Sequence, residues 1–467
     1  MHYLYFVNGD CFTIMLFCGK IQQNKVLEIE EKMLGYIYDK KYECLSRSEI
    51  ENLQSERLTK LVKYVYDNVA SYRIKMDAKK LKPTDIKSIK DLYKLPFTTK
   101  DDLRDNYPFG LFAVPQNKIN RIHASSGTTG KLTVVGYTKN DIEIWSTLMA
   151  RSLAMAGVTK DDTVHISYGY GLFTGGLGAH YGAEKLGAAV VPVSSGNTKR
   201  QIMLLQDFKA TTLCCTPSYA AFIADELKAQ NIKLSELNLK SGVFGAEPWS
   251  YKMRDELEKK LNICALDVYG LSEIMGPGVS MECEIKNGSH IYEDHFIAEI
   301  IDENTLEPKG QNVQGEIVFT TLTKEGLPLI RYRTKDISSL TCEQCKCGRT
   351  TVRMSKVVGR TDDMLIIRGV NVFPSQIETV LLNTQNIEPH YQIIVERIGN
   401  LDTITIEIEI SDNLFSDTVG KIESTKRKIA AELDSVLGIS ADIVFVGPNT
   451  IPRSEGKAKR VIDKRKL

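Results

Sequence analysis

Residues 124 to 138 read ASSGTTGKLTVVGYT, and this stretch decides how the rest of the chain is interpreted. Small, hydroxylated or flexible residues, with one lysine, fill seven consecutive positions, which are Ser125, Ser126, Gly127, Thr128, Thr129, Gly130 and Lys131. Glycines let the backbone approach a ligand closely, and hydroxyls beside free N–H groups form a donor-rich nest for phosphate oxygens. For an isolated stretch of this composition a solvated loop would be the commoner interpretation. Here the β-branched pair Val134 and Val135 follows, whereas a Walker loop opens into a helix, so we predict a phosphate-binding loop that is not a P-loop.

The bulk composition is that of a globular protein with more than one domain. The chain has 467 residues, of which 42% are hydrophobic and 25% charged, and one core rarely serves that length. The net charge of +1 provides no field that would attract nucleic acid or a membrane surface. No stretch reaches the roughly 18 apolar residues that span a bilayer. The ten cysteines are too sparse and uneven for a disulfide scaffold. We therefore expect a cytoplasmic protein with reduced thiols that binds neither nucleic acid nor a membrane.

The first 35 residues show no clear period. Their apolar run from Cys11 to Cys18 lacks the preceding basic region and the following cleavage site of a signal peptide. We expect residues 1–35 to be a disordered extension, or a wrongly assigned start ahead of Met33.

The order of the predicted elements indicates an α/β fold. A first helix is predicted from residue 46 onward, with Ser48 as its cap. Short buried strands are predicted at 163–167, 189–193, 211–215, 241–245 and 264–268. Helices at 140–157, 198–208, 217–229 and 250–261 fill the gaps between them. Strands that alternate with helices of this length predict a mostly parallel sheet wrapped in helices.

The pattern changes near Gly359. A helix at about 376–384, strands at about 391–396 and 403–410, a helix at about 418–437 and a strand at about 442–446 are predicted there. Together they form a compact α+β unit of about 100 residues, the size of a small domain. The sequence thus predicts a large N-terminal α/β domain and a small C-terminal α+β domain.

Seven motifs occur in the order in which one enzyme family carries them. They are SSGTTGK at 125–131, YGYGLFTGG at 168–176, FGAEPWS at 244–250, YGLSEIMGPG at 269–278, RYRTKD at 331–336, GRTDDML at 359–365 and PRSEGKAKR at 452–460. With these motifs the chain resembles, from about Gly35 to its C-terminus, the adenylate-forming acyl-CoA synthetases and most closely the phenylacetate–CoA ligases. The resemblance implies an adenylation domain over residues 36–361, a mobile domain over 362–467 and a hinge at Asp362.

The resemblance also implies a reaction. ATP would convert an aryl acid, phenylacetate or a similar one, into an acyl-adenylate, and coenzyme A would then displace AMP. An alternative is an adenylating enzyme that passes the acyl group to a carrier protein or to another cofactor, as a coenzyme F390 synthetase does. A nucleotide sensor without chemistry is disfavoured because Glu273, Asp336 and Lys457 are intact. The expected small molecules are ATP, Mg²⁺, coenzyme A and the acid, and a homodimer is a further possibility.

Most of the implied site binds the nucleotide. Besides Ser125 to Lys131, the implied nucleotide-binding residues are Gly245, Ala246, Glu247, Pro248, Tyr269, Gly270, Ser272, Asp336 and Arg360. Small residues at 245–248 would admit the flat adenine beside Tyr269. A carboxylate can accept hydrogen bonds from both hydroxyls of the ribose diol, and the resemblance assigns this role to Asp336.

Three residues are implied to act in catalysis, because attack of a carboxylate on a polyphosphate requires charge neutralisation and alignment. Thr128 would contact phosphate, and Glu273 would hold Mg²⁺, which prefers hard oxygen ligands. Lys457 would meet the carboxylate and the α-phosphate during adenylation. The motif is one residue shorter than usual between Pro452 and Gly456, so Lys459 is the alternative, but the spacing to Arg460 favours Lys457.

The implied acyl pocket is lined by Tyr168, Phe173, Gly175, Ala246, Ile274 and Pro277. An aromatic residue with small neighbours suits a flat aryl group, although each of these residues could equally belong to the ordinary core.

The cysteines suggest a metal site. Three thiolates and an imidazole make a tetrahedral structural zinc site, and the candidate ligands are Cys283, His290, Cys345 and Cys347, with Cys342 outside the set. The spacing is not that of a standard zinc knuckle, so reduced and unliganded thiols are the alternative.

Overall fold

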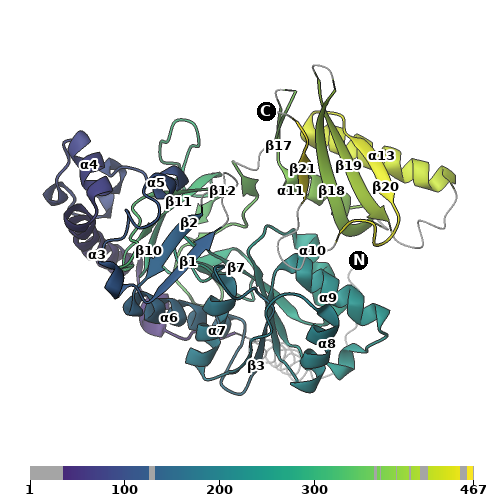
Figure 1. Cartoon of the computed structure of the whole chain (residues 1–467), viewed down its shortest axis with the longest axis horizontal. Helices are drawn as coiled ribbons and strands as arrows, with labels where there is room; N and C mark the ends of the chain where they lie inside the picture. Colours follow the sequence, from purple (N-terminus) through teal and green to yellow (C-terminus); the bar gives the residue numbers. More distant parts are fainter. Residues whose placement is uncertain are drawn as a thin grey trace, which may run out of the picture.

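The computed structural model describes residues 35–125, 132–361, 365–368, 370–384, 387–398, 401–410, 419–452 and 460–465. A large domain and a smaller one are visible in Figure 1, with the small domain at the upper right. The predicted fold class is confirmed. The boundary between residues 361 and 362 stays a prediction, because the predicted hinge residue Asp362 lies outside the described residues.

In the described part of the chain four α-helices precede the first strand, namely α2 (Lys40–Glu43), α3 (Arg47–Asn68), α4 (Ala70–Ala78) and α5 (Lys100–Asp105). The cap of α3 is Ser46 and not Ser48, so that prediction was wrong. The Ser46 side chain accepts a hydrogen bond from the backbone N–H of Glu49, and the Glu49 carboxylate accepts one from the backbone N–H of Ser46. This reciprocal pair is a capping box, which satisfies two N–H groups that would otherwise lack partners.

The largest sheet has nine strands in the order β13-β14-β9-β8-β7-β6-β5-β3-β4. Its parallel strands are β3 (Thr163–Ile166), β4 (Ala189–Val191), β5 (Thr212–Cys215), β6 (Ser241–Gly245) and β7 (Cys264–Tyr269). Helix α6 (Lys139–Met155) precedes β3, and the helices between the parallel strands are α7 (Gly175–Leu186), α8 (Thr198–Asp207), α9 (Pro217–Ala229) and α10 (Tyr251–Leu261). The predicted alternation of strands and helices is confirmed here, with ends shifted by at most two residues at each predicted element.

Beyond β7 the paired strands of the large domain are antiparallel, which the prediction of mostly parallel sheets did not include. The nine-stranded sheet continues through β8 (Ser280–Glu282), β9 (Ser289–Ile291), β14 (Arg353–Met354) and β13 (Leu340–Thr341). A second sheet contains β10 (Phe296–Ile301), β11 (Gly315–Thr321), β12 (Tyr332–Ser338) and β15 (Gly359–Arg360). Antiparallel neighbours need no crossover helix, so a pattern read from alternating strands and helices cannot reveal them.

The small domain contains a hairpin of β16 (Leu365–Ile367) and β17 (Val370–Val372), followed by helix α11 (Pro374–Leu382). A sheet in the order β20-β19-β18-β21 follows, formed by β18 (Ile387–Ile398), β19 (Leu401–Ile410), β20 (Asp442–Val446) and β21 (Val461–Asp463), and helix α13 (Val419–Leu437) packs beside it. The predicted helices and strands of this domain are confirmed, whereas β16, β17 and β21 were not predicted.

Two contacts fix the chain on either side of residues 453–459 in the small domain. The backbone N–H of Ile451 donates to Glu409 Oε1 at 2.7 Å, and the backbone N–H of Ile393 on β18 donates to the carbonyl of Arg460 at 2.7 Å. Both ends of this stretch are therefore held by neighbouring strands of one sheet.

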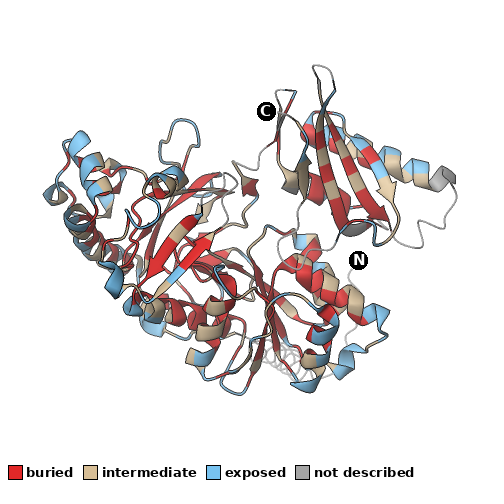
Figure 2. Ribbon diagram, in the orientation of Figure 1, coloured by how far each residue is buried: buried red, intermediate tan, exposed pale blue. Residues whose placement is uncertain are grey.

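The small domain also contacts the large one. Leu382, at the end of α11, belongs to a buried cluster with residues of α9 and α10, such as Leu227 and Leu257. His390 Nε2 lies 3.4 Å from Asp225 Oδ2 on α9. The rest of the small domain has its own core between sheet and helices, which shows as the red stripes of Figure 2.

Among the described helices, none combines the length and the hydropathy that crossing a bilayer requires.

Candidate active site and metal-ligand cluster

The predicted phosphate loop joins two paired strands, β1 (Arg121–Ser125) and β2 (Thr133–Tyr137). Ser125 stands opposite Thr133 at the open end of this hairpin. Ser126, Gly127, Thr128, Thr129, Gly130 and Lys131 lie outside the described residues. The first residue of the motif does reach the predicted magnesium ligand, because Ser125 Oγ donates to Glu273 Oε1 at 3.3 Å.

Glu273 follows strand β7 and is 5% exposed. Its carboxylate faces Ser125, and Lys100 Nζ lies 3.9 Å from Oε1. Two carboxylate oxygens beside a phosphate loop are the hard ligands that Mg²⁺ prefers, so this residue fits the role predicted for it.

A buried lysine that the sequence analysis missed holds the backbone around Glu273. Lys324 is 2% exposed, and its ammonium donates to the carbonyls of Glu273 at 2.9 Å and of Ile274 at 2.7 Å. It also lies over the ring of Tyr137, whose hydroxyl donates to the carbonyl of Ser272. Burial lowers the pKa of Lys324 to about 8. No sequence signal distinguishes Lys324 from the many exposed lysines of the chain.

The predicted adenine and ribose residues meet at the seam between the two large sheets. Tyr269, at the end of β7, donates its hydroxyl to Asp336 Oδ2 on β12 at 2.7 Å. Arg360, on β15, donates to Asp336 Oδ1 at 2.7 Å and stands opposite Asp336 in the strand register. Burial raises the pKa of Tyr269 well above its ordinary value, so the phenol remains a donor. The carboxylate predicted to hold the ribose is thus oriented by two protein groups.

The predicted adenine wall begins where β6 ends. A side chain at Gly245 would meet the carbonyl oxygen of Val268 at 2.1 Å, so β6 and β7 require glycine here. Ala246 has a φ of 71°, a backbone conformation that L side chains rarely adopt. Glu247 Oε1 accepts from the backbone N–H of Ser218 at 2.7 Å, which ties the wall to the start of α9, and Pro248 is exposed.

The predicted acyl-pocket residues fall into two groups. Tyr168, Ile274 and Ala246 are buried or partly buried, and Tyr168 donates to the carbonyl of Val243 at 3.4 Å. Phe173 is 39% exposed and covers Gly175 at the start of α7. Pro277 packs against the next turn of α7, since a side chain at Gly178 would meet its Cδ at 2.9 Å.

His123 was also missed, and it connects this pocket to the phosphate hairpin. The residue lies on β1, is 1% exposed, and its Nδ1 is 3.1 Å from the carbonyl oxygen of Leu172. Its ring meets Tyr137 and Trp145 edge to face, and Trp145 donates its indole N–H to the carbonyl of Pro277 at 2.7 Å. The 172–174 loop and Pro277 are therefore held by one aromatic cluster.

The four candidate zinc ligands converge, although they come from two distant parts of the sequence. One ligand atom from each of Cys283, His290, Cys345 and Cys347 lies within 4.8 Å of all the others, and we call these residues the Cys/His cluster. Hydrogen bonds from the thiols of Cys283 and Cys345, together with the nearby His290, hold the pKa of Cys347 below that of an ordinary thiol. Cys342 is exposed and contacts Gln311 instead.

The predicted catalytic lysine Lys457, its alternative Lys459 and the hinge residue Asp362 lie outside the described residues. Arg460, which follows them, is described and lies over the ring of Tyr391.

Comparisons with known proteins agree with this geometry. Residues 58–322 match the family model of AMP-binding enzymes, and residues 369–465 match the model of the AMP-binding enzyme C-terminal domain. The chain is 49% identical to a phenylacetate–coenzyme A ligase of Thermus thermophilus, over 92% of this chain and all of that protein. It is 50% identical to one of Escherichia coli, over 91% of this chain and 97% of that protein. By contrast, a medium-chain-fatty-acid–[acyl-carrier-protein] ligase of Teredinibacter turnerae is 32% identical over 22% of this chain.

Solved structures of a 2-hydroxyisobutyryl-CoA ligase resemble the chain to different degrees. In its postadenylation state, with R3-HIB-AMP, that enzyme matches with a TM-score of 0.85 at 26% identity, over 91% of each chain. In its thioesterification state, with 2-HIB-AMP and CoA, the TM-score is 0.68 at 28% identity over the same coverage. The arrangement of the two domains therefore resembles the postadenylation state more closely.

With half of its residues identical over nine-tenths of its length, and with the AMP-binding models matched in both domains, the chain belongs to the AMP-binding enzymes and, within them, to the phenylacetate–coenzyme A ligase family.

Proposed function

We propose that this protein activates phenylacetate, or a closely related aryl acid, with ATP and transfers the acyl group from AMP to coenzyme A. The observation that supports this proposal most is the near-complete match to phenylacetate–coenzyme A ligases from different bacteria. Transfer to a carrier protein is the second candidate. It has weaker support, because the relative named for that acceptor aligns with 22% of the chain.

Each residue near the nucleotide has a defined task in this proposal. Asp336, oriented by Tyr269 and Arg360, would accept the ribose hydroxyls. Glu273 would hold Mg²⁺, which when bound neutralises charge on the phosphates. Lys324 would keep the Glu273 backbone in place through its two carbonyl contacts. Donors fixed before the reaction stabilise developing charge without reorganising, which is why a buried and fully bonded support suits this site.

The proposal assigns the remaining predicted residues as the family does. Thr128 and its neighbours in the 125–131 loop would bind the β- and γ-phosphates. Lys457 would stabilise the attacking carboxylate and the α-phosphate, and Asp362 would be the hinge about which the small domain turns for the coenzyme A step.

A structural zinc ion in the Cys/His cluster is part of the same proposal, since three sulfur atoms and one imidazole nitrogen are a ligand set typical of such sites. A cytoplasmic location is proposed because the eight cysteines in the described part of the chain are all unpaired thiols. A homodimer is retained as a proposal, which light scattering of the purified protein would test.

The substrate proposal predicts a preference among acids. In an assay of acid-dependent AMP release with coenzyme A, phenylacetate-like acids should give the highest kcat/KM, well above acetate and long-chain fatty acids. The physical reason is that a pocket with Tyr168, Phe173 and small neighbours suits a flat ring. Equal or better turnover of acetate would overturn the aryl proposal, and acid-dependent pyrophosphate exchange without coenzyme A-dependent AMP release would favour another acceptor.

The Tyr269–Asp336 contact predicts a specific defect in ATP binding. Tyr269→Phe removes one of the two donors that orient the carboxylate, and a hydrogen bond to a charged group contributes about 1.5 kcal/mol, or roughly tenfold. We expect the KM for ATP to rise about tenfold with kcat within about twofold. The control is Tyr93→Phe at a tyrosine that is 59% exposed. An unchanged KM for ATP in Tyr269→Phe would show that this contact does not position the nucleotide.

The domain rotation predicts that two substitutions separate the half-reactions. Lys457→Ala should abolish most pyrophosphate exchange while thioester formation from supplied acyl-adenylate survives, because the lysine serves only the first arrangement. Asp362→Pro should spare exchange and block the coenzyme A step, because proline fixes the hinge backbone. Rates of each half-reaction measure the split. Similar losses in both half-reactions for both variants would contradict domain alternation, and loss of exchange in Lys459→Ala alone would reassign the lysine.

A further inference from the structure

The Cys/His cluster has the dimensions of a tetrahedral zinc site. With Zn–S of about 2.3 Å and Zn–N of about 2.1 Å, tetrahedral geometry places two sulfur ligands about 3.8 Å apart and a sulfur and a nitrogen about 3.6 Å apart. The Sγ atoms of Cys283 and Cys345 are 3.7 Å apart, and Cys347 Sγ lies 3.4 Å from His290 Nε2. A disulfide would require about 2.05 Å between the sulfur atoms. The observed spacing is therefore that of ligands around one ion.

The histidine is oriented for this role. His290 is fully buried, and its Nδ1 lies 3.0 Å from Thr351 Oγ1, so Nε2 is the nitrogen that faces the sulfur atoms. Second contacts of this kind fix the ring of metal-bound histidines. Cys283 and His290 flank the β8–β9 connection, whereas Cys345 and Cys347 precede β14. An ion bound here would crosslink these two parts of the chain.

The residues that follow Cys347 hold the first part of the described chain, residues 35–46, which we call the N-terminal segment. Arg349 donates to the Glu43 carboxylate and, at 2.7 Å, to the carbonyl of Tyr36. Thr350 donates its backbone N–H to the carbonyl of Glu43 at 3.1 Å and its hydroxyl to the carbonyl of Leu45 at 2.6 Å. The hydroxyl of Thr350 also lies 3.4 Å from the carbonyl of Glu43, so five contacts from two residues join the cysteine loop to the N-terminal segment.

The central contact is deeply buried. Glu43 is 1% exposed and Arg349 is 3% exposed, and Glu43 Oε1 also lies 3.5 Å from Arg151 Nε on α6. A buried carboxylate is stable only while its charge partners stay in place, because breaking such a pair leaves an uncompensated charge. Arg349, two residues from Cys347, and Arg151 together compensate the buried charge of Glu43, so displacement of Arg349 removes one of its two charge partners.

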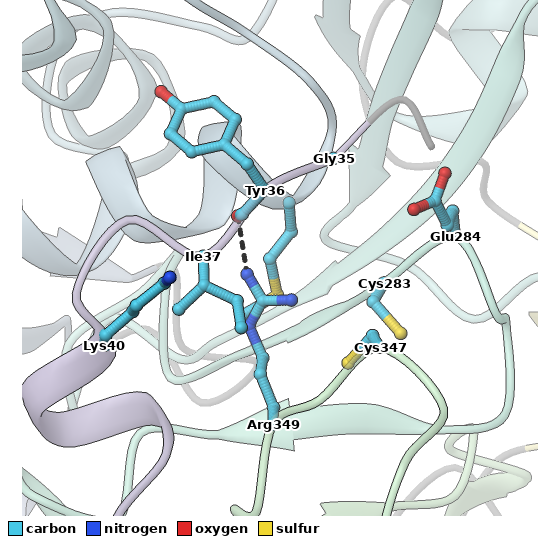
Figure 3. A pocket seen from close by; sticks show the side chains of 9 residues that line it. Gly35, Tyr36, Ile37, Lys40, Cys283, Glu284, Cys347 and Arg349 are labelled. Carbon is cyan, nitrogen blue, oxygen red and sulfur yellow. Dashed lines mark hydrogen bonds between the residues drawn. The ribbon is translucent and has the colours of Figure 1, made fainter. Parts of the chain in front are cut away.

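A cavity of about 270 Å³ separates the N-terminal segment from the cluster. Figure 3 shows Cys283 and Cys347 on one side of it and Tyr36, Ile37 and Lys40 on the other, with Arg349 reaching across to the Tyr36 carbonyl. Tyr36 is held on the far side by hydrogen bonds to the carbonyls of Ala154 and Val158. On the side of the cysteine loop, the contacts of Arg349 and Thr350 attach the segment.

We infer that a zinc ion in the Cys/His cluster acts as a clasp that holds the N-terminal segment against the large domain. This inference rests on the zinc assignment made for the proposed function. The ion fixes the position of the loop at Cys345 and Cys347. The fixed loop in turn positions Arg349 and Thr350, and these two residues bind Tyr36, Glu43 and Leu45. The nucleotide site uses other residues, so the clasp governs attachment of the segment and not the chemistry.

The experiment uses the full-length protein, purified without chelator. Elemental analysis should find about one zinc per chain. Zinc is then removed with a high-affinity chelator, and hydrogen exchange is measured by mass spectrometry on peptides covering residues 36–45. Exchange in these peptides should become at least about tenfold faster, which corresponds to losing a single favourable contact to a buried charge. One equivalent of Zn²⁺ should restore the original rate. Phenylacetate-dependent pyrophosphate exchange, measured on the same samples, should stay within about twofold.

Matched variants separate the steps. Cys347→Ser should lose zinc and loosen the segment, whereas Cys342→Ser, at an exposed cysteine outside the cluster, should change neither. Arg349→Met should keep its zinc and still loosen the segment, because it removes the connection to Glu43 and Tyr36 while all four candidate ligands stay in place.

Each failure has its own meaning. Absence of zinc in the purified protein would overturn both the metal assignment and the clasp. Zinc at one per chain, with unchanged exchange in residues 36–45 after its removal, would overturn the clasp alone. Loss of pyrophosphate exchange together with zinc would overturn the separation of the clasp from the chemistry, and absence of phenylacetate-dependent exchange in the zinc-loaded protein would contradict the proposed function instead.

Discussion

The hydrogen bond from Tyr269 to Asp336 joins the two large sheets along the seam where the candidate active site lies. Tyr269 closes the last parallel strand of the nine-stranded sheet, and Asp336 lies within the antiparallel sheet, where Arg360 holds its other oxygen. The same seam carries Glu273, a few residues beyond Tyr269, whose backbone is bonded to Lys324 from the loop after β11. The residues predicted to bind adenine, ribose and the metal ion thus converge because two sheets of different topology meet along one line.

Much of this could be predicted from the sequence, and the limits have physical causes. The parallel strands from Thr163 to Tyr269 have helices between them, and this alternation of strands and helices can be recognised from the sequence alone. The antiparallel sheet has no such marker, because its strands are joined by loops. Ser46 was misjudged in favour of Ser48 since both serines precede the helix, and only the reciprocal bond to Glu49 decides between them. Lys324 and His123 escaped notice because burial, and not residue type, gives each its role.

The Cys/His cluster shows the opposite case. Its four residues span 65 positions without the spacing of a known knuckle, yet residue chemistry alone selected the set that the fold brings together. Cys342, which the prediction placed outside the set, is exposed and contacts Gln311 instead. The ion pair between Arg349 and Glu43 could not be predicted from the sequence, because Glu43 lies about 300 residues before Arg349 and is buried only in the folded chain.

The anchoring of the chain at Ile451 and Arg460 has a mechanical consequence. Lys457 is three residues from Arg460, and three extended residues reach at most about 11 Å. The strand pairing at Ile393 therefore sets a short tether for this lysine. In the proposed mechanism Lys457 would therefore move together with the sheet to which Arg460 is bonded. The orientation of that whole sheet, more than the freedom of a loop, would then set the distance between this amine and a phosphate.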